Sequence, residues 1–133
     1  MSRLSERIEN YNKAFELFAT VVEEYRKDSE NIINHMALLQ SFEICIELGW
    51  KVLKDYLATK EVQVYLPKDV IKEAFHFEVI PNGQIWIDML QSRNATSHEY
   101  KLEKVQEILI KISSEYYEEL SKFREQIKGF INE

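Results

Sequence analysis

The stretch MALLQSFEICIELGWKVLKDYL, residues 36–57, carries apolar side chains on more than one side at helical spacing. A helix that is apolar around most of its circumference is buried on several sides. We therefore expect a helix over about residues 32–58 to form the centre of the fold, with surface left over for a second chain. Gly49 lies mid-helix, where glycine costs about 1 kcal/mol relative to alanine. That cost predicts a close helix contact at Gly49.

One narrow polar stripe interrupts the apolar surface of this helix. It consists of Gln40, Glu43, Glu47, Lys51 and Lys54. Two interpretations remain open. The stripe can face solvent, with an i,i+4 ion pair between Glu47 and Lys51. Alternatively, Gln40, Glu43 or Glu47 borders a functional site around Arg93, and Glu43 and Glu47 then support that site.

Helical spacing of apolar residues extends to both sides of the central stretch. It predicts further helices over about residues 4–25, 67–75, 83–94 and 102–130. Pro67 suits the first turn of the short one, and Asn82 is a candidate cap for the next. Four long segments and one short segment predict an all-α fold, an antiparallel four-helix up-and-down bundle with one extra short helix. No linker divides the chain, so we expect a single helical domain over residues 1–133.

Composition narrows the class of protein further. The chain has 133 residues with three glycines, two prolines and a net charge of -6. So few turn residues argue against a β-sandwich. The acidic balance argues against a broad electrostatic grip on nucleic acid, although a local basic site remains possible. Cys45 is the only cysteine, so no intrachain disulfide is expected, and no apolar run is long enough to cross a membrane. We expect a cytoplasmic protein.

A polar segment between the last two helical patterns, RNATSHEY at residues 93–100, brings an arginine, a histidine and a tyrosine together. We expect the fourth helix to end near Arg93 or Asn94, which places His98 and Tyr100 in the following turn. An imidazole titrates near neutrality and can move the proton of a ribose 2′-hydroxyl. A guanidinium can bind the scissile phosphate. This chemistry suits RNA cleavage without a metal, and one histidine per chain favours a symmetric dimer.

A structural role explains the same segment equally simply. Arg93 would then cap its own helix, and Thr96 or Ser97 would open the next one. His98 and Tyr100 would be loop residues packed on the bundle. Spacing alone favours this alternative, because matches of three residues arise by chance.

Neither a metal nor a cofactor is expected. The three histidines and the single cysteine lack the spacing of zinc ligands. There is also no glycine-rich loop of the kind that holds phosphates. Any chemistry would therefore fall to side chains such as those of residues 93–100.

The segment also carries a resemblance to a known family. Arg93, His98 and Tyr100 match the R-x4-H-x-Y motif of HEPN domains, in particular of HepT-like proteins. A wider set of segments resembles the nucleotidyltransferase substrate-binding proteins: residues 37–43, 47–57, 67–75, 83–86 and 89–100. The resemblance covers about residues 4–130, and the chain keeps every defining position of the motif.

The resemblance implies an all-α HEPN-like domain that forms a homodimer and binds a minimal nucleotidyltransferase. In HepT-like relatives the helical protein is a toxin with metal-independent RNase activity. The nucleotidyltransferase is the cognate antitoxin, which transfers AMP from ATP onto the motif tyrosine. Carried over to this chain, Arg93 and His98 are catalytic, Asn94 supports the site, Tyr100 accepts AMP, and RNA is the substrate.

Two other classes of function stay open. A noncatalytic subunit would dock the nucleotidyltransferase and present its substrate, and the motif would then line a shared binding cleft. A plain helical interaction protein would use the motif only structurally. Cleavage of single-stranded RNA without divalent metal, abolished by His98→Ala, separates the enzyme from both.

Overall fold

The computed structural model describes residues 2–98 and 102–131, and every regular element in these ranges is helical. The elements are α1 (Arg3–Lys27), α2 (Ile32–Thr59), α3 (Pro67–His76), α4 (Gly83–His98), α5 (Leu102–Lys111), the π-helical η1 (Ile112–Tyr116), α6 (Tyr117–Gln126) and the 3-10 helix η2 (Ile127–Gly129). The prediction of an all-helical chain is confirmed. None of the helices described combines the length and apolar character that crossing a membrane requires.

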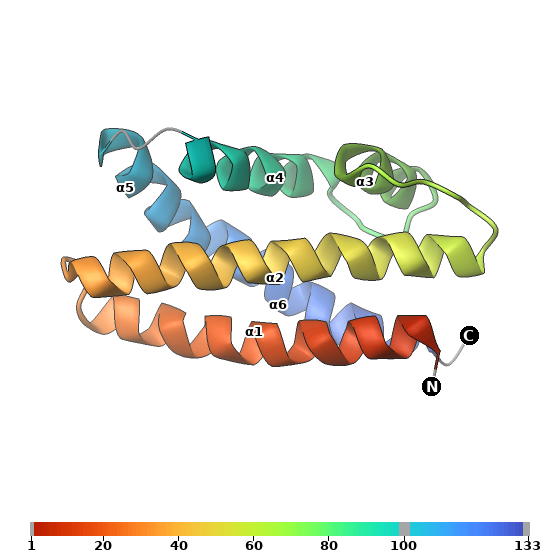
Figure 1. Ribbon diagram of the computed structural model, residues 1–133, viewed down its shortest axis with the longest axis horizontal. Helices are drawn as coiled ribbons and strands as arrows, with labels where there is room; N and C mark the ends of the chain where they lie inside the picture. Colours follow the sequence, from red (N-terminus) through yellow and green to blue (C-terminus); the bar gives the residue numbers. More distant parts are fainter. Residues whose placement is uncertain (1, 99–101, 132–133) are drawn as a thin grey trace.

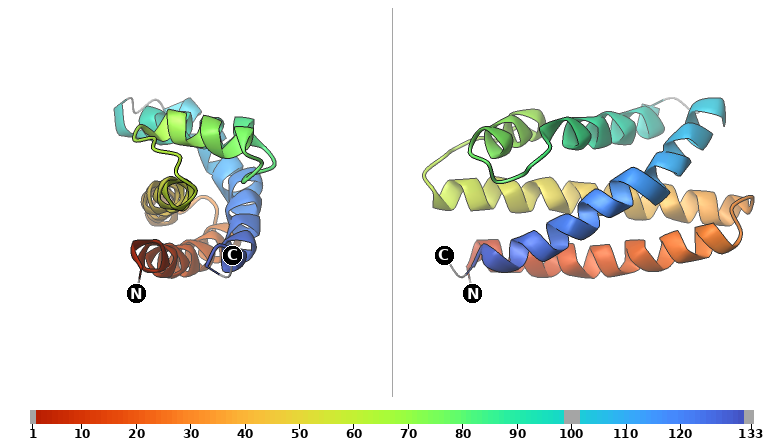
Figure 2. Two further views of the ribbon diagram at one scale, coloured as in Figure 1. Left: turned by 90° about the vertical axis from the view of Figure 1, so that its right-hand side faces the viewer. Right: turned by 180° about the vertical axis from the view of Figure 1, so that it is seen from behind.

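Helix α2 lies in the middle of the molecule, with α1 along one side and α3 and α4 along the other (Figure 1). The end view in Figure 2 shows α5 and α6 covering a third side, while the fourth side of α2 is open. Leu38, Phe42, Ile46 and Leu53 of α2 are completely buried. Burying such side chains contributes about 1.5–3 kcal/mol each. The prediction that residues 36–57 form the central helix is confirmed.

The predicted close contact at Gly49 is also present. A Cβ atom on Gly49 would lie 3.3 Å from Cε1 of Tyr11 and 3.4 Å from the Trp86 ring. Tyr11 is held in place because its hydroxyl donates a 2.7 Å hydrogen bond to the carbonyl of Leu120. Helices α1 and α4 therefore approach α2 at the one position that has no side chain. This approach brings Arg93, about two turns beyond Trp86, up to α2.

Helices α3 and α4 pack against each other and form the layer that carries the motif. Pro67 occupies the first turn of α3, as predicted. The Asn82 side chain accepts a 3.3 Å hydrogen bond from the N–H of Ile85, which confirms the predicted cap of α4. Gly83 permits a close approach here, since a Cβ atom at this position would lie 3.1 Å from Phe75.

The predicted helix over about residues 102–130 is present as consecutive helical elements, but it is not a regular α-helix throughout. The α-helix gives way to a π-helical turn at Ile112–Tyr116, and the last residues form a 3-10 turn. The hydroxyls of Ser113 and Ser114 both donate to the carbonyl of Ile110, at 3.2 and 2.7 Å, and Arg26 of α1 donates to the carbonyl of Ser113. Side-chain donors thus compete for the helix carbonyls, which disturbs the regular ladder. Residues 102–129 still form one rod, which is inclined across α1 and α2 (Figure 2).

Candidate functional site

The centre of the candidate site is an ion pair between Arg93 of α4 and Glu47 of α2. Nη1 of Arg93 donates a hydrogen bond to Oε2 of Glu47. Nη2 of the same guanidinium donates to the side-chain oxygen of Asn94 at 3.2 Å. The Arg93 side chain is 24% exposed and that of Glu47 38%, so both charges stay in reach of solvent. An ion pair of this exposure contributes little to stability and mainly fixes the position of the guanidinium.

Glu47 holds three neighbours at once. Besides Arg93, it accepts a 3.1 Å hydrogen bond from Nε1 of Trp50 and lies 3.6 Å from Nζ of Lys51. Both interpretations of the polar stripe therefore apply to this residue. The predicted Glu47–Lys51 pair forms, and Glu47 also contacts Arg93. Because Trp50 is buried, its indole fixes the carboxylate from the core side.

The other two candidates on the polar stripe are Glu43 and Gln40, which are located here by their position on α2 relative to Glu47. Glu43 lies one helical turn before Glu47 on α2 and is half-buried, and Gln40 is exposed. Residues one turn apart share a helix face, so Glu43 faces the same side as the Glu47–Arg93 pair. A supporting role for Glu43 stays a prediction.

The prediction that α4 ends near Arg93 or Asn94 is wrong, because α4 continues to His98. Between Gln84 and His98 the chain contains neither glycine nor proline, so nothing in the sequence breaks the helix. Arg93 consequently lies inside a helix rather than at its C-terminus. Thr96 and Ser97 lie inside it as well, so neither opens the next helix.

The remaining motif residues are placed only in part. His98 is the last residue of α4, and the structure describes its backbone but not its side chain. Tyr100 lies outside the described residues. The catalytic role of His98 and the acceptor role of Tyr100 therefore stay predictions.

Ser92 and Tyr116 form a second polar contact beside the motif, one that sequence reasoning missed. Their hydroxyl oxygens lie 2.8 Å apart, and Tyr116 is buried at the end of the π-helical turn. Burial raises the pKa of the Tyr116 phenol, and the hydrogen bond with Ser92 opposes that shift. In the sequence, Tyr116 fits the helical spacing of the core residues, and that spacing predicts only packing. The only local signal was the Ser113–Ser114 pair, which favours an irregular turn.

Cavities flank α4 on both sides of Arg93. One of about 400 Å³ borders Arg93 and Asn94 together with the start of α3. Another, of about 320 Å³, has Ser92 and Tyr116 in its lining, and its charged residues balance: Lys104 and Lys111 against Asp88 and Glu107. Only the first cavity is lined by Arg93, and Lys68 is its other charged residue, so the guanidinium can meet an anionic ligand on that side.

A metal centre and a cysteine nucleophile find no support in the described part of the chain. No group of three or more His, Cys, Asp or Glu side chains gathers there. Cys45 is completely buried, and burial raises the pKa of its thiol from 9.0 to about 12. A thiol in that environment stays protonated at neutral pH and does not act as a nucleophile.

Comparisons with known proteins agree on one group. The family described as nucleotidyltransferase substrate binding protein like matches residues 6–129 of the chain. A protein of Haemophilus influenzae named probable ribonuclease HepT is 33% identical over 79 residues, which is 56% of this chain and 54% of the relative. The match thus spans only about half the length of that curated relative.

A solved structure has the same fold. It contains the tri-AMPylated HEPN toxin of Shewanella oneidensis in complex with MNT antitoxin. The TM-score is 0.78 at 14% sequence identity, over 97% of this chain and 99% of the other. At that identity the likeness concerns the fold alone.

Proposed function

Because the chain belongs to the nucleotidyltransferase substrate binding protein-like family of HepT-like proteins, we propose that it is the helical partner of a minimal nucleotidyltransferase. In this proposal it is the HEPN toxin of a toxin–antitoxin pair, a metal-independent RNase. The nucleotidyltransferase is the cognate antitoxin and silences the RNase by adenylylating Tyr100. The names of the relatives support the proposal, since one is called a ribonuclease and the other a HEPN toxin in complex with an antitoxin.

The observation that carries the proposal is the Glu47–Arg93 pair. A guanidinium bound on one edge by a carboxylate and on another by Asn94 is oriented before any ligand arrives. Such preorganisation is what a group that stabilises developing charge requires. Glu47 and Asn94 are positioning residues in this proposal, and Glu43 joins them from the preceding turn of α2.

The reaction needs a base and an acid beside Arg93. The ribose 2′-oxygen forms a bond to phosphorus as the bond from phosphorus to the 5′-oxygen breaks. A base takes the 2′-hydroxyl proton, and an acid gives a proton to the leaving 5′-oxygen. Arg93 binds the phosphate whose negative charge grows in the transition state. His98 serves as the imidazole, and a second copy from a partner protomer completes the acid–base pair.

Because the reaction needs a second His98, we propose that the protein forms a homodimer through the open face of α2. Ile33, Met36 and Ile44 lie on that face with exposed fractions of 71%, 61% and 40%. Exposed apolar residues at helical spacing favour burial against a second helix. Glu47 lies on the same face of α2 as these apolar residues. A twofold axis at this face would therefore bring two Glu47–Arg93 pairs to one interface. We further propose that the fold is a four-helix bundle with α3 as the added short helix. The proposed location of the protein is the cytoplasm.

Adenylylation of Tyr100 would block this site directly. The phenol oxygen forms a bond to the α-phosphorus of ATP, pyrophosphate leaves, and the phenol proton passes to a base. The product carries a phosphodiester charge and an adenosine two residues beyond His98. An anion beside Arg93 competes with the RNA phosphate for the same donors.

A noncatalytic docking subunit is the second candidate function. The net charge of -6 favours it, because an acidic surface repels RNA outside a local basic site. In that case the chain binds the nucleotidyltransferase and presents its substrate without cutting RNA. Cleavage assays on purified protein separate the two candidates.

The RNase test uses single-stranded RNA with a metal chelator present. Wild-type protein should cleave it, and His98→Ala should abolish cleavage with unchanged helical circular dichroism. His76→Ala, at an exposed position on α3, is the matched control and should cleave normally. RNA left intact by the wild-type dimer at every concentration would reject the RNase and favour the docking subunit.

The modification test uses the cognate nucleotidyltransferase with ATP and intact-mass spectrometry. AMP should appear on the wild-type chain and be missing from Tyr100→Phe. Tyr65→Phe is the control, because Tyr65 is 67% exposed and lies outside the motif. Equal labelling of Tyr100→Phe and wild type would rule out Tyr100 as the acceptor.

A further inference from the structure

A groove between α3 and α4 leads to Arg93. Two cavities compose it, about 400 Å³ beside Arg93 and about 470 Å³ beside Gly83, and both are lined by Ile87. Lys68 near the start of α3 borders the first, and Phe75 near its end borders the second. The two helices therefore run in opposite directions, and the two cavities are neighbours along the line where the helices meet, on either side of Ile87.

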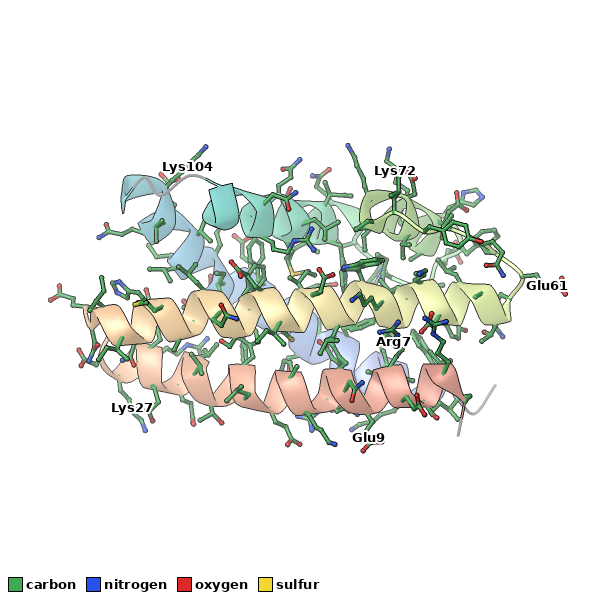
Figure 3. The ribbon with its side chains drawn as sticks, viewed as in Figure 1. Arg7, Glu9, Lys27, Glu61, Lys72 and Lys104 are labelled. Atoms are coloured by element: carbon green, nitrogen blue, oxygen red, sulfur yellow. The ribbon has the colours of Figure 1, made fainter. Side chains whose placement is uncertain are left out.

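The charge of this groove is opposite to that of the whole chain. The sequence contains 23 acidic residues against 17 lysines and arginines, yet no carboxylate of the described residues lines either cavity. Lys68 and Lys72 lie one helical turn apart on α3, and Arg93 lies at the far end. Within the described ranges neither lysine forms an ion pair. Figure 3 shows Lys72 on the outer side of α3, away from α2.

The uncharged lining has the two features that bind nucleobases. Its side-chain amides are Asn82, Gln84, Gln91 and Asn94. The oxygens of Asn82 and Asn94 and the nitrogen of Gln84 already form hydrogen bonds within the chain. An amide that is engaged through one of these groups can still bind a ligand through the other, as in Asn82 and Gln84. Phe75 offers an aromatic ring that is 53% exposed beside Lys72. Amide groups can hydrogen-bond to base edges, and exposed aromatic rings stack on bases of any sequence. Cations interleaved with such groups are typical of sites for single-stranded nucleic acid.

We propose that the groove between α3 and α4 binds single-stranded RNA and guides it to Arg93. The proposal rests on the RNase function proposed above and adds the surface that holds the substrate outside the scissile phosphate. From Gly83 to Asn94 the groove follows α4 for about 16 Å at 1.5 Å per residue. One strand of a duplex advances about 3.4 Å along its axis per phosphate, and an extended single strand advances further, so the groove has the length of a few nucleotides. In the proposal these nucleotides place phosphates on Lys68 and Lys72 and stack a base on Phe75.

An acidic segment of a partner protein is the competing ligand for a basic groove. Carboxylates would use Lys68, Lys72 and Arg93, and peptide groups could meet the amides, but acidic side chains offer nothing that stacks on the exposed Phe75 ring. RNA uses all three kinds of lining group. The composition therefore favours RNA, and loss of partner binding serves as an outcome of the test.

The experiment measures binding separately from cleavage. Fluorescence anisotropy of a labelled single-stranded RNA follows affinity in the His98→Ala background, with a metal chelator, over a range of salt concentrations. Lys68→Gln/Lys72→Gln should weaken binding, and the slope of log affinity against log salt should fall by about 0.7 for each phosphate that a lysine no longer neutralises. Lys13→Gln/Lys122→Gln removes the same charge from α1 and α6, outside the groove, and should leave the slope unchanged.

Phe75→Leu provides a charge-neutral second variant. It keeps an apolar side chain against Gly83 but removes the stacking ring, and affinity should fall about tenfold. Circular dichroism checks that the helices persist. Unchanged affinity in Phe75→Leu would overturn the stacking contact, and with it the placement of a base in the groove.

Each remaining outcome decides between the two proposals. Equal losses in both lysine double variants, no loss in either, or no RNA binding by the His98→Ala chain would overturn the groove. If Lys68→Gln/Lys72→Gln bound RNA normally but failed to bind the nucleotidyltransferase, the proposed RNA groove would be overturned in favour of a docking site for that protein. RNA binding through the groove without cleavage by the wild type would reject only the RNase. Cleavage with an unchanged KM in Lys68→Gln/Lys72→Gln would reject only the groove.

Discussion

Replacing Glu47 and Arg93 singly and together tests whether the central ion pair exists in solution. Two unit charges about 4 Å apart attract by about 4 kcal/mol at an effective dielectric constant of about 20. Desolvation, side-chain entropy and solvent screening offset most of this attraction, and measured values for exposed pairs are about 0.2–1 kcal/mol. Glu47 and Arg93 are 38% and 24% exposed, and Trp50 also holds the carboxylate. We therefore expect a coupling energy near the top of that range, about 1 kcal/mol.

The assay is a double-mutant cycle by urea unfolding, monitored by circular dichroism, with Glu47→Gln and Arg93→Gln. Glu16 and Arg124 form the control pair at 2.8 Å, with exposed fractions of 65% and 30%. Because this pair is more exposed, its coupling should be about 0.5 kcal/mol or less. High salt should weaken the control pair more than the central pair. A Glu47–Arg93 coupling no larger than that of the control pair would refute the positioning argument.

The same variant has a functional consequence under the proposed RNase activity. Glu47→Gln keeps an oxygen that can accept from Arg93 and Trp50, but it removes the negative charge. The guanidinium is then less firmly oriented, and kcat should fall by about tenfold while KM changes little. An unchanged kcat in Glu47→Gln would show that the carboxylate does not position Arg93 for catalysis.

Three further predictions concern stability. Tyr116→Phe removes the hydrogen bond with Ser92 and should lower the free energy of unfolding by about 0.5–1.5 kcal/mol, with Ser92→Ala non-additive in a double-mutant cycle. Between pH 9.0 and about 12 the unfolded chain loses the Cys45 thiol proton before the folded chain does. The free energy of unfolding should therefore fall as pH rises through that window, by up to about 1.4 kcal/mol per pH unit, and less steeply in Cys45→Ala. Leu53→Ala should cost about 2–5 kcal/mol in urea unfolding, whereas Leu17→Ala, at a position of α1 that is 57% exposed and outside the proposed dimer face, should change stability by about 0.5 kcal/mol or less.

The central helix shows how much of the fold could be predicted from the sequence. Residues 36–57 are apolar around the helix, and burial on several sides follows from that pattern alone. Gly49 predicted a close contact because a mid-helix glycine needs compensation. Which side chains fill the space, Tyr11 and Trp86, depends on helices that lie far apart in the sequence.

Helix ends and irregular turns were less predictable. The fourth helix was predicted to end near Arg93 because residues 93–100 are polar, but it continues to His98 since no breaker stops it. The π-helical turn depends on Arg26 of α1 and on two serine hydroxyls that compete for carbonyls. A contact between residues 87 positions apart leaves no periodic signal in the sequence.

The candidate site divides in the same way. The residue types at 93–100 and the match to a motif are properties of the sequence, and so is the membership of a helical family. The sequence left open whether Glu47 faces Lys51 or Arg93, because helical periodicity specifies a face and not the neighbour across it. Tertiary packing decided that it contacts both: Gly49 lets α4 approach α2, and that approach brings the guanidinium to the carboxylate. Charge behaves likewise, since the net value of -6 is a sum over the chain, whereas the basic groove exists only where α3 and α4 meet.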